Sequence, residues 1–269
     1  MVLLHTPWFN IGAWDLLLLI AVSSMGVVIA SLHDPRFKAL MLSLPLPFTI
    51  SVLSVGKPLD ATNVVALNVL LAYTHGVRLL HYRWRVPIIP AILISALGYC
   101  CLGGVLAQLI PRTPTAFWLA CAGTMAFAAL LHYGLPAREE PGHRNPLPLP
   151  VKCASTFGVV FFLVLIKQII QGFMTVFPMV GVIASYESRH SLWTNCRQIP
   201  IIMLTMTPMM IAIYLAETRY ALATGWALAL GWVVLFAILL PMTRDVWLGL
   251  PARDEHANRS GAAPAAKLG

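Results

Sequence analysis

Apolar stretches long enough to cross a bilayer recur along almost the whole of this 269-residue chain. A transmembrane helix needs roughly 20 mostly apolar residues. Charged residues make up only 10% of the sequence and the mean hydropathy is +0.80, whereas about a quarter of a soluble domain is charged. We therefore predict an all-α, polytopic membrane helix bundle of about nine transmembrane helices, with no separate soluble domain. The predicted spans are 12–32, 38–56, 61–80, 88–110, 115–135, 152–170, 172–187, 199–216 and 220–241.

Basic residues are distributed unevenly between the two sides that these spans define. Fourteen of the eighteen Lys and Arg residues lie in or beside the segments that follow odd-numbered spans. The other four are Lys57, Arg112, Lys167 and Arg219. Because cytoplasmic loops carry the excess of Lys and Arg, this bias predicts an N-terminus outside and a C-terminus in the cytoplasm. We expect a multi-pass protein of the bacterial cytoplasmic (inner) membrane, with the lipid bilayer as a partner.

The chain aligns on itself when it is shifted by 111 residues. Residues 56–78 then match 167–189 without gaps, and Asp60 falls opposite Gln171. The alignment predicts two repeats of four spans, either one to four and five to eight or two to five and six to nine. An even number of spans gives both units the same orientation, so they would be parallel. The identities are few, and a chance match of two membrane segments is the alternative.

The repeat divides the chain into four parts. A first repeat with an extra N-terminal span covers 1–137, and a cytoplasmic loop covers 138–150. A second repeat covers 151–243 and is followed by a tail over 244–269. The tail is polar and rich in Ala, Gly and Pro, and we expect it to be disordered because it has few large apolar groups to bury.

Several polar residues lie within the spans or at their predicted outer ends, where a charge is costly. Lys167 follows Lys152 by fifteen residues, or roughly 22 Å of helix, which places it in the outer third of the bilayer. There it either extends its ammonium to the headgroups or faces a binding site. In the second case a polar outer vestibule would attract a small anion. The candidate substrate-binding residues are Lys57, Asp60, Lys167, Gln168, Gln171 and Asp15.

Charged residues also lie at the predicted cytoplasmic ends of spans three and seven. His75 and Arg78 align with Tyr186 and Arg189, and Glu187 adds an acid. These residues form either an interfacial band, whose arginines bind lipid phosphate, or a cytoplasmic gate. Within span three, Asn63 and Asn68 lie five residues apart and are explained by hydrogen bonds between helices.

Prolines interrupt three of the spans. Pro45 and Pro47 lie in the second, Pro178 in the seventh and Pro208 in the eighth. Each removes a backbone donor and leaves a carbonyl that lipid cannot satisfy. Broken helices at corresponding positions of two halves are typical of a binding site near the bilayer midplane. Pro178 aligns with Leu67 and not with a proline, however, so kinks that only aid packing are the alternative.

Motifs for catalysis are missing from the sequence. We find no nucleophile elbow, no zinc-protease motif, no phosphate-binding glycine loop and no suitably spaced pair of carboxylates. The five cysteines have no metal or redox spacing. We therefore predict no enzyme activity, no cofactor and no metal site. No nucleic-acid partner is expected either, because the positive charge lies in the predicted cytoplasmic segments.

The second half carries a pattern of lysines at both ends of one helix, a glycine before Phe-Pro and Ile-Ala-Ser-Tyr, and a later proline and aromatic residues. These residues are Lys152, Lys167, Gly172, Phe177, Pro178, Ile183, Ala184, Ser185, Tyr186, Pro208, Tyr214 and Trp232. From Val151 to about Leu240 the chain thus resembles the GlpM family of small, four-helix bacterial inner-membrane proteins. The resemblance implies a GlpM-like second half and a diverged first-half copy, and it favours spans two to five and six to nine as the repeat. It implies no substrate and no catalytic residue.

Two classes of function fit these features. The first is a membrane transport or permeation protein for a small anionic or polar envelope-related solute. The second is a non-catalytic accessory or scaffold subunit of a cell-envelope assembly or export complex, acting with a complex partner or as a homo-oligomer.

Overall fold

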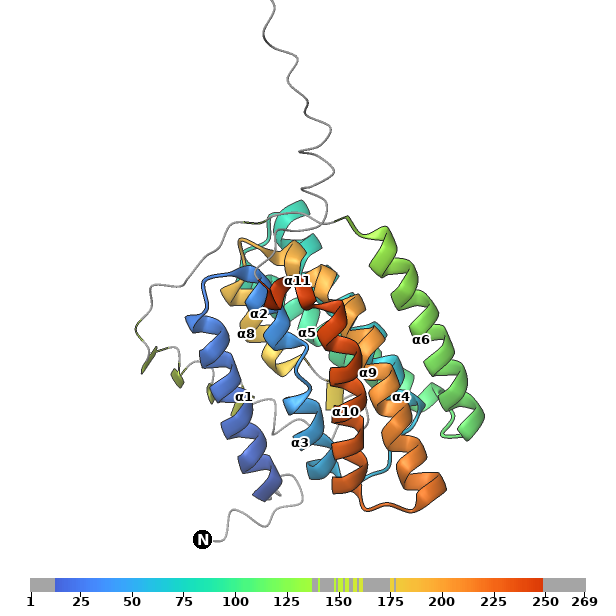
Figure 1. Cartoon of the computed structure of the whole chain (residues 1–269). Helices are drawn as coiled ribbons and strands as arrows, with labels where there is room; N and C mark the ends of the chain where they lie inside the picture. Colours follow the sequence, from blue (N-terminus) through green and yellow to red (C-terminus); the bar gives the residue numbers. More distant parts are fainter. Residues whose placement is uncertain are drawn as a thin grey trace, which may run out of the picture.

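The computed structural model describes residues 13–136, 140, 148, 150–151, 153–154, 157–158, 160–161, 175–176 and 178–248. Over these residues the regular elements are all helices, and they form one bundle (Figure 1). The elements are α1 (Ala13–Ser31), α2 (Pro35–Leu42), α3 (Leu46–Val55), α4 (Ala61–Arg78), the π-helix η2 (Leu79–Arg83), α5 (Ile88–Leu109), α6 (Pro114–Gly134), α8 (Met179–Glu187), α9 (Leu192–Tyr220), α10 (Thr224–Met242) and α11 (Arg244–Trp247).

Seven segments of this bundle are long and apolar enough to cross a membrane. They are α1, α2 with α3, α4 with η2, α5, α6, α9 and α10. The first five match the first five predicted spans to within a few residues, so the expectation of a helical, multi-pass membrane protein is confirmed at that level. Most of the sixth predicted span lies outside the described residues, as do the first part of the seventh and most of the tail.

Local sequence signals explain where several helices begin. Asp34 accepts a hydrogen bond from the backbone of Arg36 at 2.8 Å, and Pro35 occupies the first position of α2. Thr113 accepts from the backbone of Ala116 at 3.2 Å, and Pro114 opens α6. A short polar side chain followed by proline is a favoured helix start, because the proline lacks an N–H that the first turn could not use.

Prolines break the second span as expected. The α2 helix ends at Leu42, and α3 begins at Leu46 with Pro45 at its N-cap and Pro47 in its first turn. The α3 helix then ends at Val55, and the φ of its C-cap residue Gly56, 62°, lies in the left-handed region that favours glycine.

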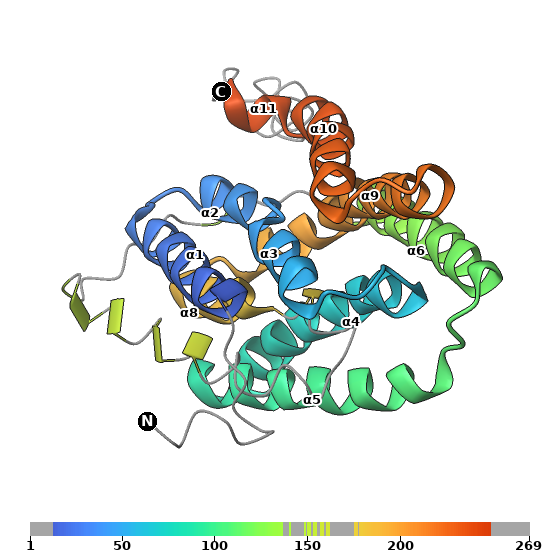
Figure 2. The same cartoon turned by 90° about the horizontal axis from the view of Figure 1, so that it is seen from below.

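The α9 helix is the most buried of the seven long apolar segments and lies between α10 and α6 (Figure 2). Its span window is 61% buried, against 28% for α5, 22% for α6 and 28% for α10. It has 29 residues and begins at Leu192, seven residues before the predicted span at 199. The extra residues are helical because Leu192 and Cys196 pack into the core and because a carboxylate binds the first turn, as described below. The peripheral helices leave apolar faces that suit contact with lipid.

The helices define two ends of the bundle. We call the end with the starts of α1 and α4 the lower end and the end with the starts of α2 and α9 the upper end (Figure 1). The α6 helix finishes at the upper end and α9 begins there (Figure 1). Most of the chain between them lies outside the described residues, so the prediction of nine spans is not established.

The segment that contains α8 runs parallel to α4. Asn63 and Tyr73 of α4 hydrogen-bond to Thr175 and Ser185, and both pairs are 112 residues apart in the chain, close to the predicted shift of 111. The helices that follow differ, however. The α9 and α10 helices pack along each other, whereas α5 and α6 diverge from the loop that joins them (Figure 2). The described residues therefore do not establish a repeat.

Candidate functional site

Three of the predicted substrate-binding residues lie at the lower end of the bundle. Asp15 is buried in the first turn of α1 and accepts a hydrogen bond from Ser54 of α3. Lys57 is exposed between α3 and α4, and Asp60 caps α4. The three residues thus share one end, but the two acids have different partners. The other predicted residues, Lys167, Gln168 and Gln171, lie outside the described residues.

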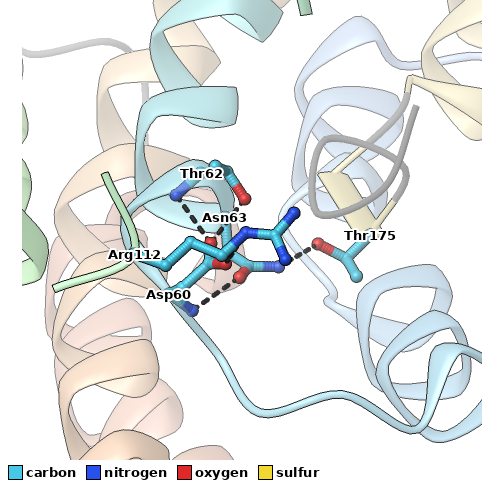
Figure 3. Close-up of polar contacts among 5 residues, drawn as sticks. All are labelled: Asp60, Thr62, Asn63, Arg112 and Thr175. Carbon is cyan, nitrogen blue, oxygen red and sulfur yellow. Dashed lines mark hydrogen bonds and ion pairs between the residues drawn. The ribbon is translucent and has the colours of Figure 1, made fainter. Parts of the chain in front are cut away.

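Asp60 belongs to a connected set of polar side chains that we call the lower-end network (Figure 3). Its Oδ1 atom accepts from the backbone N of Thr62 at 2.8 Å and from the Thr62 hydroxyl at 2.5 Å. In return, Asn63 Oδ1 accepts from the backbone N of Asp60 at 2.8 Å. This reciprocal pattern is a capping box, which satisfies donors that a helix N-terminus leaves without partners. Arg112, in the loop between α5 and α6, lies 3.6 Å from Asp60 Oδ2 through its Nε atom.

The network continues toward the centre of the bundle through Asn63. Its Nδ2 atom donates to the Thr175 hydroxyl at 2.9 Å, which connects α4 to the segment before α8. The hydrogen bonds that the sequence predicts for Asn63 and Asn68 are confirmed, since Asn68 donates to Thr124 of α6 at 2.7 Å. Arg112 and Thr175 were not among the predicted site residues.

A cavity of about 80 Å³, which we call the central cavity, lies between the break of α2 and α3 and the start of α8. Pro45 and Pro47 of the break between α2 and α3 line one part of its wall, and Pro178 before α8 lines another. Most of the wall is apolar and comes from α1, α2, α3, α4, α8 and α9. The polar side chains in the wall are Thr74, Thr175, Ser185 and Asn195.

The polar groups of this wall differ in their hydrogen bonding. The Thr74 hydroxyl donates to the Leu70 carbonyl at 2.9 Å, and the Ser185 hydroxyl lies 3.5 Å from that of Tyr73. Asn195 is 2% exposed, and its Oδ1 atom has no hydrogen-bond partner among the residues that the structure describes. Such an atom is expensive to bury, and with less than 1 Å² of accessible surface it does not face the open space of the cavity. None of the described residues that line the cavity is charged.

A larger and more polar cleft of about 960 Å³ opens at the upper end between α2, α6, α9 and α11. Gln198 of α9 lines this cleft and donates to the Ser43 hydroxyl at 2.5 Å. Ser43 is fully buried between Leu42 and Leu44, and both of these leucines line the central cavity. The contact between Gln198 and Ser43 therefore lies between the cleft and the cavity.

Glu140, from the predicted cytoplasmic loop, binds the start of α9 in the wall of this cleft. Its carboxylate accepts from the backbone N of Trp193 at 3.2 Å, and from the backbone N and hydroxyl of Thr194 at 2.7 and 2.8 Å. A carboxylate at a helix N-terminus satisfies free N–H groups and complements the helix dipole. This contact explains why α9 begins earlier than its hydropathy indicates.

The residues predicted to form a cytoplasmic gate all lie at the upper end, but each has its own partner. His75 bonds to the Leu71 carbonyl of its own helix at 3.1 Å. The guanidinium of Arg78 lies over the ring of Trp193 at 4.4 Å. These contacts do not distinguish an interfacial band from a cytoplasmic gate, so both stay predictions.

The other two predicted gate residues contact Tyr186, which the sequence singled out, and Tyr82 and Lys38, which it did not. Arg189 lies over the Tyr186 ring at 5.1 Å, and its carbonyl accepts from Tyr82 at 2.9 Å. Glu187 is 3% exposed, and its backbone carbonyl accepts from Lys38 Nζ at 3.1 Å. Lys38 is itself 1% exposed, although its sequence context predicts a residue at a loop boundary.

The described residues contain no group of three or more His, Cys, Asp or Glu side chains that could hold a metal ion. Comparisons of the chain with protein-family models, curated proteins and solved structures gave no match. The functional argument therefore depends on the geometry of the cavity and of the polar groups around it.

Proposed function

We propose that this protein is a transport or permeation protein for a small polar or anionic envelope-related solute in a bacterial cytoplasmic membrane, with the central cavity as its binding site. The observation that carries the proposal is the position of the cavity beside the break between α2 and α3 and beside the start of α8 at Pro178. Unwound backbone is tolerated at membrane depth where it lines a cavity or is buried in protein. Transporters use discontinuous helices of this kind to form their substrate sites.

Polar groups that lead from the cavity toward both ends of the bundle support this function. Thr175 lines the cavity and accepts from Asn63 of the lower-end network. On the opposite side, the Gln198 and Ser43 pair lies between the cavity and the upper cleft. A solute that loses its hydration shell would meet polar partners along this line, which lowers the barrier to its passage.

We also propose that the second half is a GlpM-like unit. Pro178 and Ser185, two of the residues that carry the resemblance, line the cavity. If the second half is a diverged duplicate of the first, the start of α8 at Pro178 contributes to the same site as the break between α2 and α3.

Solute flux into vesicles that contain the purified protein tests the transport function. We expect at least one of a panel of small polar solutes and anions to enter faster than into protein-free vesicles. Ser185→Leu should abolish the difference, because the larger side chain would fill the cavity. Ser24→Leu is the matched control, since Ser24 is exposed on α1 and bonds only to the Ile20 carbonyl of its own helix.

Two results would count against transport. One is flux equal to that of protein-free vesicles for every solute in the panel. The other is flux that Ser185→Leu and Ser24→Leu change equally. Either result would favour the scaffold or accessory function.

A further inference from the structure

We infer that the upper cleft, between α2, α6, α9 and α11, binds the headgroup of an anionic phospholipid, with the lipid phosphate at Arg197 of α9. The inference goes beyond the transport function and does not depend on it. It is carried by the basic side chains in the wall of the cleft, by the bonding of the acids beside them, and by the position of the cleft among helices whose outer faces suit lipid.

Three helices bring basic side chains into the wall of the cleft. Arg36 comes from the first turn of α2, His132 from the last turn of α6 and Arg197 from the second turn of α9. Arg197 is half-buried, and its charge acts on the His132 imidazole, so the two side chains are close where α6 packs on α9. In the described part of the chain, the Arg197 guanidinium forms no ion pair and donates no hydrogen bond. A guanidinium stays charged in proteins, and its fork of N–H groups matches the oxygens of a phosphate.

Two of the acids in the same wall already bond to backbone groups. Glu140 accepts three hydrogen bonds at the start of α9, and both of its carboxylate oxygens take part. Asp34 accepts from the backbone N of Arg36 at the start of α2. Each of these carboxylates thus complements the N-terminus of a helix. Asp34 and Asp245 are exposed, and their oxygens can also accept hydrogen bonds from the hydroxyls of a lipid headgroup.

The position of the cleft favours a lipid over a soluble anion. Leu135, Ile201 and Met242 give the wall an apolar part beside the charged groups, and a lipid gains from covering it whereas a free phosphate does not. Tyr133 is 88% exposed and Trp247 is 48% exposed at the same ends of α6 and α11, as is common for aromatic residues at headgroup level. The wall draws on four of the predicted cytoplasmic segments. Basic pockets between helices on that side bind anionic headgroups.

Phosphatidylglycerol and phosphatidylcholine are a suitable pair of probes. Both carry a phosphate, but phosphatidylcholine has no net charge and no donor group in its headgroup. We would titrate each lipid into the purified full chain in a neutral detergent and count bound lipids by native mass spectrometry. The first phosphatidylglycerol should bind more tightly than the first phosphatidylcholine. Equal affinity for the two lipids overturns the inference.

Arg197→Gln tests the assignment of the phosphate. The substitution keeps a polar side chain but removes the charge, and it should weaken the first phosphatidylglycerol site about tenfold, the effect of one lost charge-assisted hydrogen bond. Arg83→Gln is the matched control, because Arg83 is exposed in η2 at the same end of the bundle and does not line the cleft. Its affinity should equal that of the unmodified protein. Equal losses in the two variants would mean that any surface arginine attracts the lipid, and they overturn the inference, as does no loss in Arg197→Gln.

The thermal midpoint separates binding from a structural role. A lipid that binds only the folded chain raises the midpoint. Phosphatidylglycerol should therefore raise the midpoint of the unmodified protein and of Arg83→Gln, and raise that of Arg197→Gln less. Without lipid, all three midpoints should agree. A lower lipid-free midpoint for Arg197→Gln would assign Arg197 to the stability of the bundle and overturn its role in binding.

Inorganic phosphate distinguishes the two sources of the anion. Added in large molar excess during the titration, it should leave phosphatidylglycerol bound, because it makes no contact with the apolar part of the wall. Displacement of the lipid by inorganic phosphate at unchanged ionic strength would assign the cleft to a soluble anion and overturn the choice of a lipid.

Discussion

The lower-end network and the central cavity contain the same kinds of side chain, but the two regions differ in hydrogen bonding. Asn63 is 4% exposed and uses both ends of its amide, accepting from Asp60 and donating to Thr175. Asn195 is 2% exposed and has an oxygen without a described partner. Buried polar groups are satisfied in most proteins, because the alternative is costly. The network therefore joins its polar groups by hydrogen bonds, whereas the wall of the cavity contains a residue with a polar atom that has no described partner. Under the proposed function, the network holds helices together and the cavity holds the solute.

Thr175 belongs to both regions, which makes the comparison testable. It accepts from Asn63 in the network and also lines the cavity. Substitutions on the network side should change stability more than flux, and those on the cavity side should change flux more than stability.

Asn63→Leu should have the largest effect on stability. It removes two hydrogen bonds and leaves the Asp60 backbone N–H without its partner, so the free energy of unfolding should fall by about 2–3 kcal/mol. Denaturant titration in detergent measures this change. Asn195→Leu, the matched amide-to-leucine change in the cavity, should cost nothing or stabilise slightly. Equal losses of unfolding free energy in the two variants would contradict the proposed difference between the lower-end network and the cavity.

Ser43→Ala should lower the free energy of unfolding less than Asn63→Leu does, and it should raise solute flux. It removes the hydrogen bond from Gln198, which costs about 1 kcal/mol. Because this contact lies between the cleft and the cavity, its loss should raise solute flux. Ser51→Ala is the control, since Ser51 is 2% exposed in α3 and its hydroxyl has no described partner. Equal flux in the two variants would show that the contact is not a barrier.

The sequence predicts the first five spans well because length and hydropathy are sufficient to specify a membrane helix. It also predicts the broken second span, because proline acts locally. Asn195 was missed because it lies in a stretch whose basic and polar residues suggest a loop. That stretch is helical through a tertiary contact, the carboxylate of Glu140 at the start of α9. Arg112 was missed because no local pattern shows which acid it would reach.

Arg112→Gln should have a small effect that depends on salt. The Arg112 side chain is 52% exposed and the Asp60 side chain 26% exposed, so solvent screens their ion pair strongly. We expect a loss of at most about 0.5 kcal/mol at low ionic strength and none at high salt. Asp60→Asn should behave similarly, because asparagine also caps helices. A large loss in either variant would assign the pair a role in the stability of the lower end.

Thr207→Val should have the smallest effect on stability and flux. It tests most directly whether an unpaired atom affects flux only in a residue that lines the cavity. Thr207 lies in the same helix as Asn195, is 0% exposed and also has a buried oxygen without a described partner, but it does not line the cavity. If an unpaired atom matters for flux only in a residue that lines the cavity, Thr207→Val should leave flux unchanged. Valine has nearly the same shape and needs no hydrogen bond, so the thermal midpoint should stay the same or rise slightly. A loss of flux equal to that of Asn195→Leu would mean that the unpaired atoms of α9 act through the helix itself and not through a residue that lines the cavity.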